Sequence, residues 1–393
     1  MYSHKNIFIL SFSCLFYMSM ASCVSKKALY LDGQEDLSPV SHAAVDIEHT
    51  LFLIGDSGGA PMGVSTPALT YLEKELINVK GNSSIIFLGD NIYPVGVPPV
   101  GSEDRPLADH RLEKQLEILD TYEGKIIFLP GNHDWYSYGR EGIQRQEVII
   151  EHYLNNRNIT VDQNNFFLPD NGCGEPHVVE LAPGLKSLVF DSHWFLNAAL
   201  KPYSFGDCKV KTRKEFMNRL EDLVEKHQGE IQVLAMHHPL YTYGPHGGGY
   251  TFSDIVFPVS QINEKYKLFL PLSGLIVKIM KGYISEQDVQ HRDAKLMKNN
   301  LLRILDKNGP TIIAGGHEHT LQHIENDSNV YIVSGAGSKN NPVGLGEGSF
   351  FSTGENGFVK VEFLKNKSVV FNYIVPDKEG KTAIILYQRV REL

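Results

Sequence analysis

Nine polar side chains stand where short apolar runs end, and their chemical types are those that bind metal ions. The runs cover 50–54, 84–88, 125–130, 231–236 and 311–314. The side chains that follow them are Asp56, Asp90, Tyr93, Asn132, His133, Asp134, His237, His317 and His319. Carboxylates, imidazoles, an amide oxygen and a phenol together suit two divalent or trivalent ions such as Fe, Mn or Zn. Any one of them alone is more often structural, but chance rarely repeats the same placement five times.

The elements around these side chains alternate between strands and helices. Apolar residues recur with helical spacing at about 66–79, 109–120, 143–155, 211–227 and 293–307. This alternation predicts an α/β layer architecture, in which functional groups gather beyond the carboxyl ends of the strands. Four later segments are predicted to be successive strands, at 330–333, 357–364, 368–376 and 383–390. Residues 250–292 break the rhythm and predict an insertion packed on the core, with a lid or a membrane-facing patch as the alternative.

Four sequence motifs, in order, resemble those of the calcineurin-like metallophosphoesterase family. They are Gly89-Asp90-Asn91-Ile92-Tyr93, Gly131-Asn132-His133-Asp134, His237-His238-Pro239 and Gly316-His317-Glu318-His319. The family usually opens with Asp-x-His, whereas the first motif here is Asp56-Ser57-Gly58. Purple acid phosphatases also lack that histidine and carry a tyrosine three residues after the second aspartate, which is the place of Tyr93. Residues 88–97 and Ser334-Gly335-Ala336-Gly337 resemble the small, tartrate-resistant type of these enzymes.

The resemblance implies a single catalytic domain over 48–376, folded as a four-layer α/β/β/α sandwich around two metal ions. The first ion would be bound by Asp56, Tyr93 and His319, the second by Asn132, His237 and His317, and Asp90 would bridge both. His237 is preferred over His238 because the family pattern is His-x-Pro and only His237 stands two residues before Pro239. A phenolate and carboxylates stabilise a trivalent ion, so the implied cofactor is Fe(III) paired with Fe, Zn or Mn(II).

The resemblance also implies hydrolysis of phosphomonoesters by a metal-bound hydroxide that attacks phosphorus in line. His133 is the predicted acid for the leaving group, with Asp134 orienting its imidazole. His246 resembles a second substrate-side histidine of the family, and a solvent-exposed loop histidine is the alternative. Two other functions are carried as alternatives. One is a phosphodiesterase or nucleotidase with the same metal centre, and the other is a lipoprotein that binds metal or phosphate without catalysis.

The composition is that of a globular protein and narrows the range of partners. The chain has 393 residues, 42% of them hydrophobic, with 46 acidic and 37 basic side chains and a formal net charge of -9. A negative charge argues against a nucleic-acid partner, because the phosphate backbone is bound by basic surfaces. We therefore expect a small phosphorylated substrate. The sequence gives neither the identity of this substrate nor the oligomeric state of the protein.

The N-terminus resembles a bacterial lipoprotein signal. Lys5 precedes an apolar run at 7–18, and Met20-Ala21-Ser22-Cys23 places small residues before a cysteine. The sequence predicts a signal peptide over 1–22, lipidation at Cys23, a tether over 23–47 and a C-terminal strand or tail over 377–393. The protein is then expected to be exported and held at a membrane by its lipid, on the periplasmic or cell-surface side, with secretion as the alternative. Cys173 and Cys208 could pair or remain thiols.

Overall fold

The computed structural model describes residues 24–31, 46–79, 82–157, 163, 165–197, 206–247 and 287–392. The predicted signal peptide, Cys23 and most of the 250–292 insertion lie outside the described residues. Among the helices that are described, none has the length and apolar character needed to cross a membrane.

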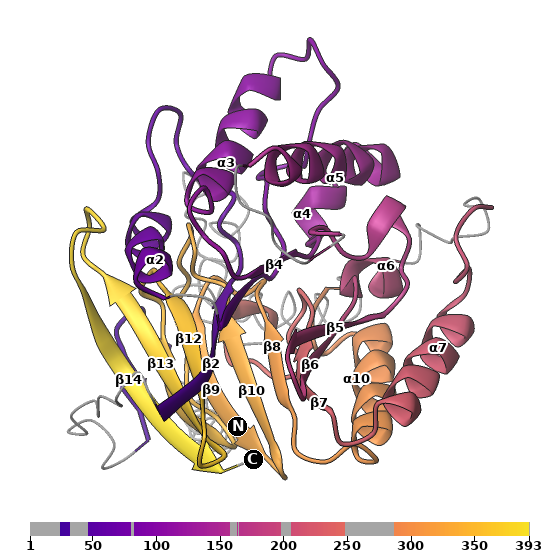
Figure 1. Cartoon of the computed structure of the whole chain (residues 1–393), viewed down its shortest axis with the longest axis vertical. Helices are drawn as coiled ribbons and strands as arrows, with labels where there is room; N and C mark the ends of the chain where they lie inside the picture. Colours follow the sequence, from indigo (N-terminus) through magenta and orange to yellow (C-terminus); the bar gives the residue numbers. More distant parts are fainter. Residues whose placement is uncertain are drawn as a thin grey trace, which may run out of the picture.

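The described residues form two β-sheets with helices on their outer faces (Figure 1). The strands are β1 Leu29–Tyr30, β2 Ile47–Ile54, β3 Ser83–Phe87, β4 Lys125–Phe128, β5 His177–Ala182, β6 Leu185–Val189, β7 Ile231–Ala235, β8 Ile312–Gly315, β9 Leu321–Asn326, β10 Asn329–Ser334, β11 Ser349–Thr353, β12 Phe358–Leu364, β13 Ser368–Pro376 and β14 Ala383–Glu392. The helices are α2 Pro67–Asn78, α3 Arg105–Glu117, α4 Asn132–Trp135, α5 Gly139–Asn155, α6 Ser192–Leu196, α7 Arg213–Lys226 and α10 Arg292–Leu305, with short 3₁₀ turns η2 Asp170–Gly172 and η5 Pro245–Gly247.

The two sheets are mixed, and their parallel strands point towards one edge of the molecule. One sheet has eight strands in the order β1-β11-β9-β10-β8-β7-β6-β5, and the other has six in the order β14-β13-β12-β2-β3-β4. In the six-stranded sheet β2, β3 and β4 are parallel. In the eight-stranded sheet β6, β7, β8 and β10 are parallel. Parallel strands carry their functional groups at their carboxyl ends, so both sheets deliver loops to the same edge.

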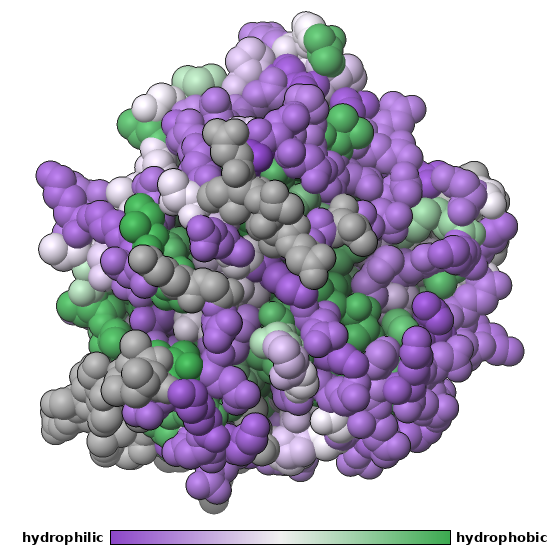
Figure 2. All heavy atoms as spheres, viewed as in Figure 1, coloured by the Kyte–Doolittle hydropathy of each residue, from purple (hydrophilic) through white to green (hydrophobic). Residues whose placement is uncertain are grey.

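Alternate residues along the central strands pack into two different parts of the core. On β2, Leu51 and Leu53 face the opposite sheet, while Phe52 and Ile54 pack outward against helices. Helices α2, α3 and α5 cover the six-stranded sheet, and α6, α7 and α10 cover the eight-stranded sheet (Figure 1). The surface seen in Figure 2 is largely hydrophilic, as expected when both strand faces are buried. The predicted α/β/β/α sandwich is thus confirmed.

The predicted elements are present with shifted boundaries and some omissions. Helix α3 begins at Arg105 rather than at the predicted 109, with Pro106 in its first turn. A proline fits there because the first turn needs no backbone N–H bond within the helix. The prediction omitted β5, β6, β9 and β11, which are strands of only five or six residues.

Two segments outside the predicted 48–376 domain contain strands that join its sheets, and one of these strands is the one predicted over 383–390. The tether prediction over 23–47 is corrected by β1, in which Leu29 pairs with Ser352 of β11. The C-terminal segment contains β14, which pairs along its whole length with β13 at the edge of the six-stranded sheet. Cys173 and Cys208, whose pairing the sequence left open, form a disulfide with a Cα–Cα distance of 5.6 Å.

A polar network joins β9 of the eight-stranded sheet to β13 and β14 of the six-stranded sheet. Glu325 of β9 accepts hydrogen bonds from Arg389 at 3.0 Å and Arg391 at 2.6 Å, both on β14. His323 bonds Tyr373 of β13 at 2.9 Å and Glu325 at 3.1 Å. Burial favours the neutral acid, but hydrogen bonds from His323 and Arg389 outweigh it and lower the pKa of Glu325 to about 2. The carboxylate therefore stabilises the contact between the sheets while it is ionised.

Glu325→Gln should lower the free energy of unfolding at pH 7 by about 1–2 kcal/mol, the scale of a charge-assisted hydrogen bond that keeps some contact with solvent. The folded pKa lies below the unfolded one, so this contribution is complete above about pH 5 and is lost as the pH falls from about 4.5 towards 2. Urea midpoints of wild type and variant should therefore differ by a constant amount from pH 7 to 5 and converge below that range. Glu379→Gln, which removes an exposed carboxylate, is the matched control. A difference that stays constant to pH 3 would contradict the assignment.

Candidate metal centre

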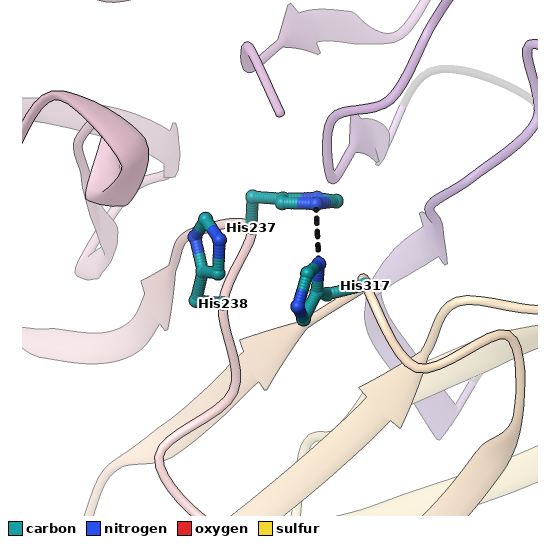
Figure 3. Close-up of side chains that lie close together, drawn as sticks. All are labelled: His237, His238 and His317. Carbon is teal, nitrogen blue, oxygen red and sulfur yellow. Dashed lines mark hydrogen bonds between the residues drawn. The ribbon is translucent and has the colours of Figure 1, made fainter. Parts of the chain in front are cut away.

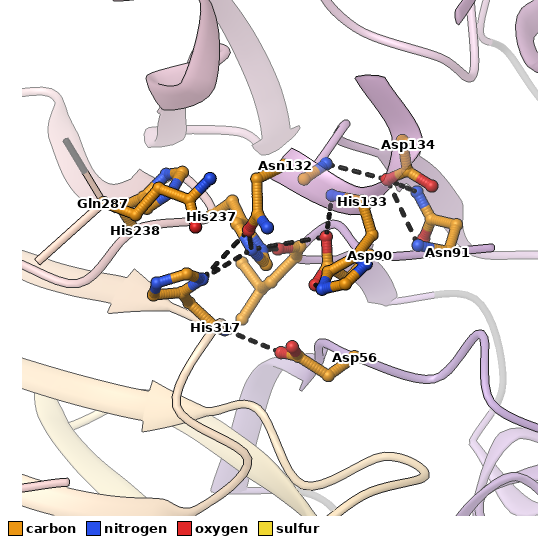
Figure 4. Close-up of polar contacts among 12 residues, drawn as sticks. Asp56, Asp90, Asn91, Asn132, His133, Asp134, His237, His238, Gln287 and His317 are labelled. Atoms are coloured by element: carbon orange, nitrogen blue, oxygen red, sulfur yellow. Dashed lines mark hydrogen bonds and ion pairs between the residues drawn. The ribbon is translucent and has the colours of Figure 1, made fainter. Parts of the chain in front are cut away.

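The seven predicted metal ligands lie together at the edge where the parallel strands of both sheets end, and Figure 4 shows Asp56, Asp90, Asn132, His237 and His317 at this edge. Asp56 follows β2, Asp90 and Tyr93 follow β3, and Asn132 follows β4. From the other sheet, His237 follows β7, and His317 and His319 follow β8. All seven except His319 are at least 96% buried as whole residues, and the exposed fraction of the His319 side chain is 17%. The strand ends therefore bring together residues that are up to 263 positions apart.

The backbone is strained at the ligands themselves. Eight non-glycine residues of the described chain have positive φ angles, and four of them are predicted ligands, namely Asp56, Asp90, His317 and His319. Such residues cost of order 1–3 kcal/mol each and gather at functional sites. The glycines beside them allow close approach, since a Cβ on Gly316 would lie 2.6 Å from Asp56 Oδ2. At these four residues the positive φ angle turns the side chain out of the line of its strand and towards the other ligands.

The first group of ligands is centred on the carboxylate of Asp56. The Tyr93 hydroxyl lies 2.8 Å from Asp56 Oδ1 and 3.0 Å from His319 Nε2. His319 Nε2 is also 3.4 Å from Asp56 Oδ1, and Asp90 belongs to the same cluster. Burial, and then the carboxylates of Asp56 and Asp90, raise the pKa of Tyr93 well above its usual value. A cation at this point would favour the phenolate instead, because it would neutralise both carboxylates.

The second group is centred on the amide oxygen of Asn132. His237 Nε2 lies 2.9 Å and His317 Nδ1 3.0 Å from Asn132 Oδ1, and the two imidazole nitrogens are 3.2 Å apart (Figure 3). His237 Nε2 is also 3.5 Å from Asp90 Oδ1, so Asp90 is shared by both groups. Tyr136 fixes the amide, because Asn132 Nδ2 donates to its hydroxyl at 2.8 Å and leaves Oδ1 facing the histidines.

The second group has an excess of electron-pair donors, which fits a metal ion. His237 Nδ1 donates to Leu88 O at 2.8 Å, so Nε2 of the neutral ring is an acceptor that faces the acceptor Oδ1 of Asn132. Two acceptors at this distance need a proton or a metal cation between them. Burial opposes a charged imidazole, but the carboxylates of Asp90 and Asp56 outweigh it and raise the pKa of His237. The centre therefore attracts positive charge, and its nitrogen and oxygen donors fit two transition-metal ions.

His133 lies beside this centre without entering either group. Its Nδ1 donates to Pro94 O at 2.7 Å, which leaves Nε2 facing the centre at 4.0 Å from Asp90 Oδ2. Its backbone N–H donates to Asp90 Oδ1 at 2.8 Å. Because the Pro94 carbonyl fixes the tautomer, Nε2 is the atom that is able to exchange a proton with a bound molecule.

Asp134 does not have the predicted role of orienting the His133 ring, which the structure gives to Pro94 O. Its buried carboxylate accepts backbone N–H groups from Gly131 at 2.7 Å, Ile92 at 3.0 Å and Asn91 at 3.2 Å. Asp134 follows β4 and these donors come from two different motif loops, so the carboxylate ties the loop after β3 to the loop after β4. The sequence places Asp134 next to His133, but in a helical turn adjacent side chains point in different directions.

Two further histidines near the centre, His246 and His238, have different surroundings. His246, on η5, packs against His317 with tilted rings whose centroids are 4.1 Å apart, and its Nδ1 bonds Asp288 Oδ1 at 2.8 Å. It therefore lies against the second group of ligands rather than alone in a solvent-exposed loop. His238 is buried with Nδ1 2.9 Å from Ser192 Oγ, whereas His237 is the histidine that faces Asn132 (Figure 4).

Three residues that the sequence did not single out surround the ligands. Tyr136 holds the Asn132 amide, and Asn341 Nδ2 lies 3.1 Å from His319 Nδ1. The Lys339 ammonium lies over the ring of Tyr93, 3.2 Å from its centroid. Tyr136 stands four residues after Asn132, and the other two follow the Ser334-Gly335-Ala336-Gly337 run closely. Proximity to a motif was the available signal, but it does not say which neighbour points inward.

Comparisons with known proteins agree with this geometry. The model of the family described as calcineurin-like phosphoesterase matches residues 49–321. Purple acid phosphatase 17 of Arabidopsis thaliana is 33% identical over 108 residues, which are 25% of this chain and 32% of that protein. The match therefore spans about a third of that relative's length.

Two solved structures are similar to this chain over most of its length. A Plasmodium protein, described as GAP50, the anchor in the inner membrane complex, has a TM-score of 0.55 at 15% identity over 88% of this chain and 89% of that one. Purple acid phosphatase PPD1 from yellow lupin (Lupinus luteus) seeds has a TM-score of 0.49 at 12% identity over 87% of this chain and 53% of that one. The Plasmodium likeness shows a shared fold.

Adding a divalent ion such as Zn²⁺ or Mn²⁺ should stabilise the protein, because the folded state alone assembles the centre. At a free metal concentration about 100 times Kd the gain is about 2.7 kcal/mol, measured as a rise in Tm against a chelator-treated sample. Asp90→Asn removes the shared carboxylate and should lose most of this gain while remaining folded in chelator. Asp109→Asn, at an exposed ion pair on α3, is the matched control. An undiminished gain in Asp90→Asn would contradict a centre built around Asp90.

Proposed function

The chain belongs to the calcineurin-like phosphoesterase family, and from this premise we propose that it is a phosphatase that hydrolyses phosphomonoesters at a binuclear metal centre. One observation carries the proposal. Two buried groups of metal-binding side chains share Asp90, and His133 Nε2 faces the same carboxylate at 4.0 Å. Two adjacent cations and a nearby proton donor are what phosphate ester hydrolysis requires.

The residues of the chain divide the work of the reaction between them. When bound, the two ions would neutralise the charge on the phosphate oxygens and make a water molecule nucleophilic. Asp56, Tyr93 and His319 would hold the first ion, and Asn132, His237 and His317 the second. His133 would give a proton from Nε2 to the leaving oxygen, held in place by the bond from Nδ1 to Pro94 O. His246, oriented by Asp288, would contact the substrate phosphate from the side of the second ion.

The phenol of Tyr93 supports Fe(III) as the first ion. Its oxygen lies within 3.0 Å of both Asp56 and His319, so a cation at this point would gain a phenolate and carboxylate oxygen. These hard anionic donors favour a trivalent ion, while the amide and two imidazoles of the second group favour Fe, Zn or Mn in the divalent state.

Binding without turnover is the second candidate function, and one observation favours it. The Plasmodium structure that shares the fold is described as an anchor. In the present chain, however, all seven predicted ligands converge and the proton-donating position next to Asn132 is a histidine with a fixed tautomer. These features support catalysis over a purely binding role.

Iron-loaded wild-type protein should absorb visible light, because a phenolate bound to Fe(III) gives a charge-transfer band. Tyr93→Phe should lose this band, since it removes the phenolate and keeps the ring. Tyr136→Phe is the matched control, because its hydroxyl contacts Asn132 and not the first group. The measurement is an absorption spectrum with elemental analysis of the same sample. A colourless wild-type protein that contains iron would contradict the Fe(III) assignment.

Metal-loaded wild type should hydrolyse phenyl phosphate faster than bis(p-nitrophenyl) phosphate, and His133→Ala should lose about 10²–10⁴-fold in turnover with unchanged metal content, as expected when a general acid is removed. His152→Ala, on the exposed face of α5, is the matched control. Faster cleavage of the diester would favour the phosphodiesterase alternative. A protein that contains both metals and cleaves neither ester would favour the binding role.

A further inference from the structure

Lys339 is a cation placed directly against a predicted metal ligand. Its Nζ lies 3.2 Å from the centroid of the Tyr93 ring, and the residue is half-buried. The edge of the same ring contacts His133, with centroids 4.5 Å apart. The ammonium and the His133 imidazole are thus neighbours of the same ring. Burial lowers the pKa of the His133 imidazole, and the nearby positive charge of Lys339 lowers it further.

The ammonium has no anionic partner of its own. Among the residues that the structure describes, Lys339 Nζ makes no hydrogen bond and no ion pair. The carboxylates that act on it electrostatically are Asp90 and Asp56, and both are predicted metal ligands. The remaining charged neighbour is Arg111, which repels it and donates to the carbonyl oxygens of Ala60 at 3.0 Å and Tyr93 at 2.7 Å.

The loop that carries Lys339 holds it firmly in this position. Ser338 Oγ donates to the backbone oxygen of Asp56, and Asn341 N donates to His319 O at 2.9 Å. Asn341 Nδ2 also contacts the His319 ring at 3.1 Å. Residues on both sides of Lys339 therefore bind ligands of the first group, which fixes the backbone from which the ammonium projects.

The charges of the metal-loaded centre indicate which kind of group Lys339 would pair with. When cations occupy the centre, the carboxylates of Asp56 and Asp90 are neutralised, and Lys339, Arg111 and the cations form an uncompensated positive region. A half-buried cation without a partner is costly, and a bound anion removes that cost. The phosphate under attack would bind to the cations. Lys339 would then remain available to pair with a second negative group.

We propose that Lys339 binds a negatively charged leaving group, so that the preferred substrates are phosphoanhydrides such as inorganic pyrophosphate or a nucleoside diphosphate. This inference rests on the proposed phosphatase function and names its substrate class. A neutral alcohol would leave the ammonium without a partner, whereas a terminal phosphate would form a charge-assisted hydrogen bond with it.

The reaction balances without any further reactant. The oxygen of a water molecule forms the new bond to the phosphorus under attack, and the bond between that phosphorus and the bridging oxygen breaks. The bridging oxygen keeps the electron pair, leaves as part of the second phosphate next to Lys339 and takes a proton from His133. The attacking water releases one proton to solvent, and His133 is reprotonated from solvent.

Binding of non-hydrolysable probes tests the inference without turnover. Methylenediphosphonate should bind metal-loaded wild type more tightly than inorganic phosphate in calorimetric titrations. Lys339→Met should weaken methylenediphosphonate about tenfold and phosphate by less than about threefold, since one charge-assisted contact is lost. Lys339→Arg should restore most of the affinity. Lys298→Met is the matched control, because Lys298 Nζ also lies 3.2 Å from an aromatic centroid, that of Tyr241. Equal losses for both probes in Lys339→Met would overturn the inference.

Turnover separates failure of this inference from failure of the proposed function. Lys339→Met should lose at least about tenfold more in kcat/KM on pyrophosphate than on phenyl phosphate, again because one charged contact is removed. If the variant does not fold, Lys339→Gln gives the same comparison, and Lys339→Arg is the variant that keeps the charge. Equal losses on both substrates overturn the role of Lys339 and leave the phosphatase intact. A metal-loaded wild type that hydrolyses neither substrate overturns the proposed function itself.

Discussion

The whole structure depends on bringing electron-rich atoms together in a buried space that needs cations. Asn132 Oδ1, His237 Nε2 and His317 Nδ1 lie within 3.2 Å of one another, and two buried carboxylates stand next to them. Such a cluster opposes folding in the absence of positive charge, because desolvated acceptors and anions repel one another. The rest of the molecule must therefore hold it. Two sheets with a continuous apolar core between them provide that support, and the parallel strands deliver every ligand to one edge.

The loops at this edge convert strand ends into a centre through local strain and buried bonds. Positive φ angles at Asp56, Asp90, His317 and His319 turn these side chains away from their strands. The carboxylate of Asp134 ties two motif loops together through backbone N–H groups, so its position next to His133 in sequence has a structural meaning that differs from the predicted one. Strain of this kind persists only where the surrounding structure fixes it on several sides.

The residues outside the two groups of ligands give this chain its particular chemistry. The metal ligands alone do not set the substrate specificity of a phosphoesterase, because the same two ions serve monoesters, diesters and anhydrides. Substrate specificity comes from the side chains around the ligands. In this chain the loop after β10 adds a cation, Lys339, beside Tyr93. Tyr136 and Asn341 act in a different way, since they fix the orientation of one ligand each and so determine how the ions would sit.

The sequence by itself placed the seven converging side chains among nine that follow apolar runs, and the resemblance of their motifs to the metallophosphoesterase family implied the layer order and which seven are ligands. It also placed most helices, whose apolar spacing is a property of consecutive residues. Only the tertiary structure decided that residues 29–30 pair with β11, that Cys173 and Cys208 pair, and that Pro94 rather than Asp134 orients His133. The same holds for Lys339, whose position over Tyr93 joins residues 246 positions apart. Local patterns encode periodicity and turn chemistry, whereas a contact between distant loops depends on how the sheets pack, and no single stretch of sequence contains that information.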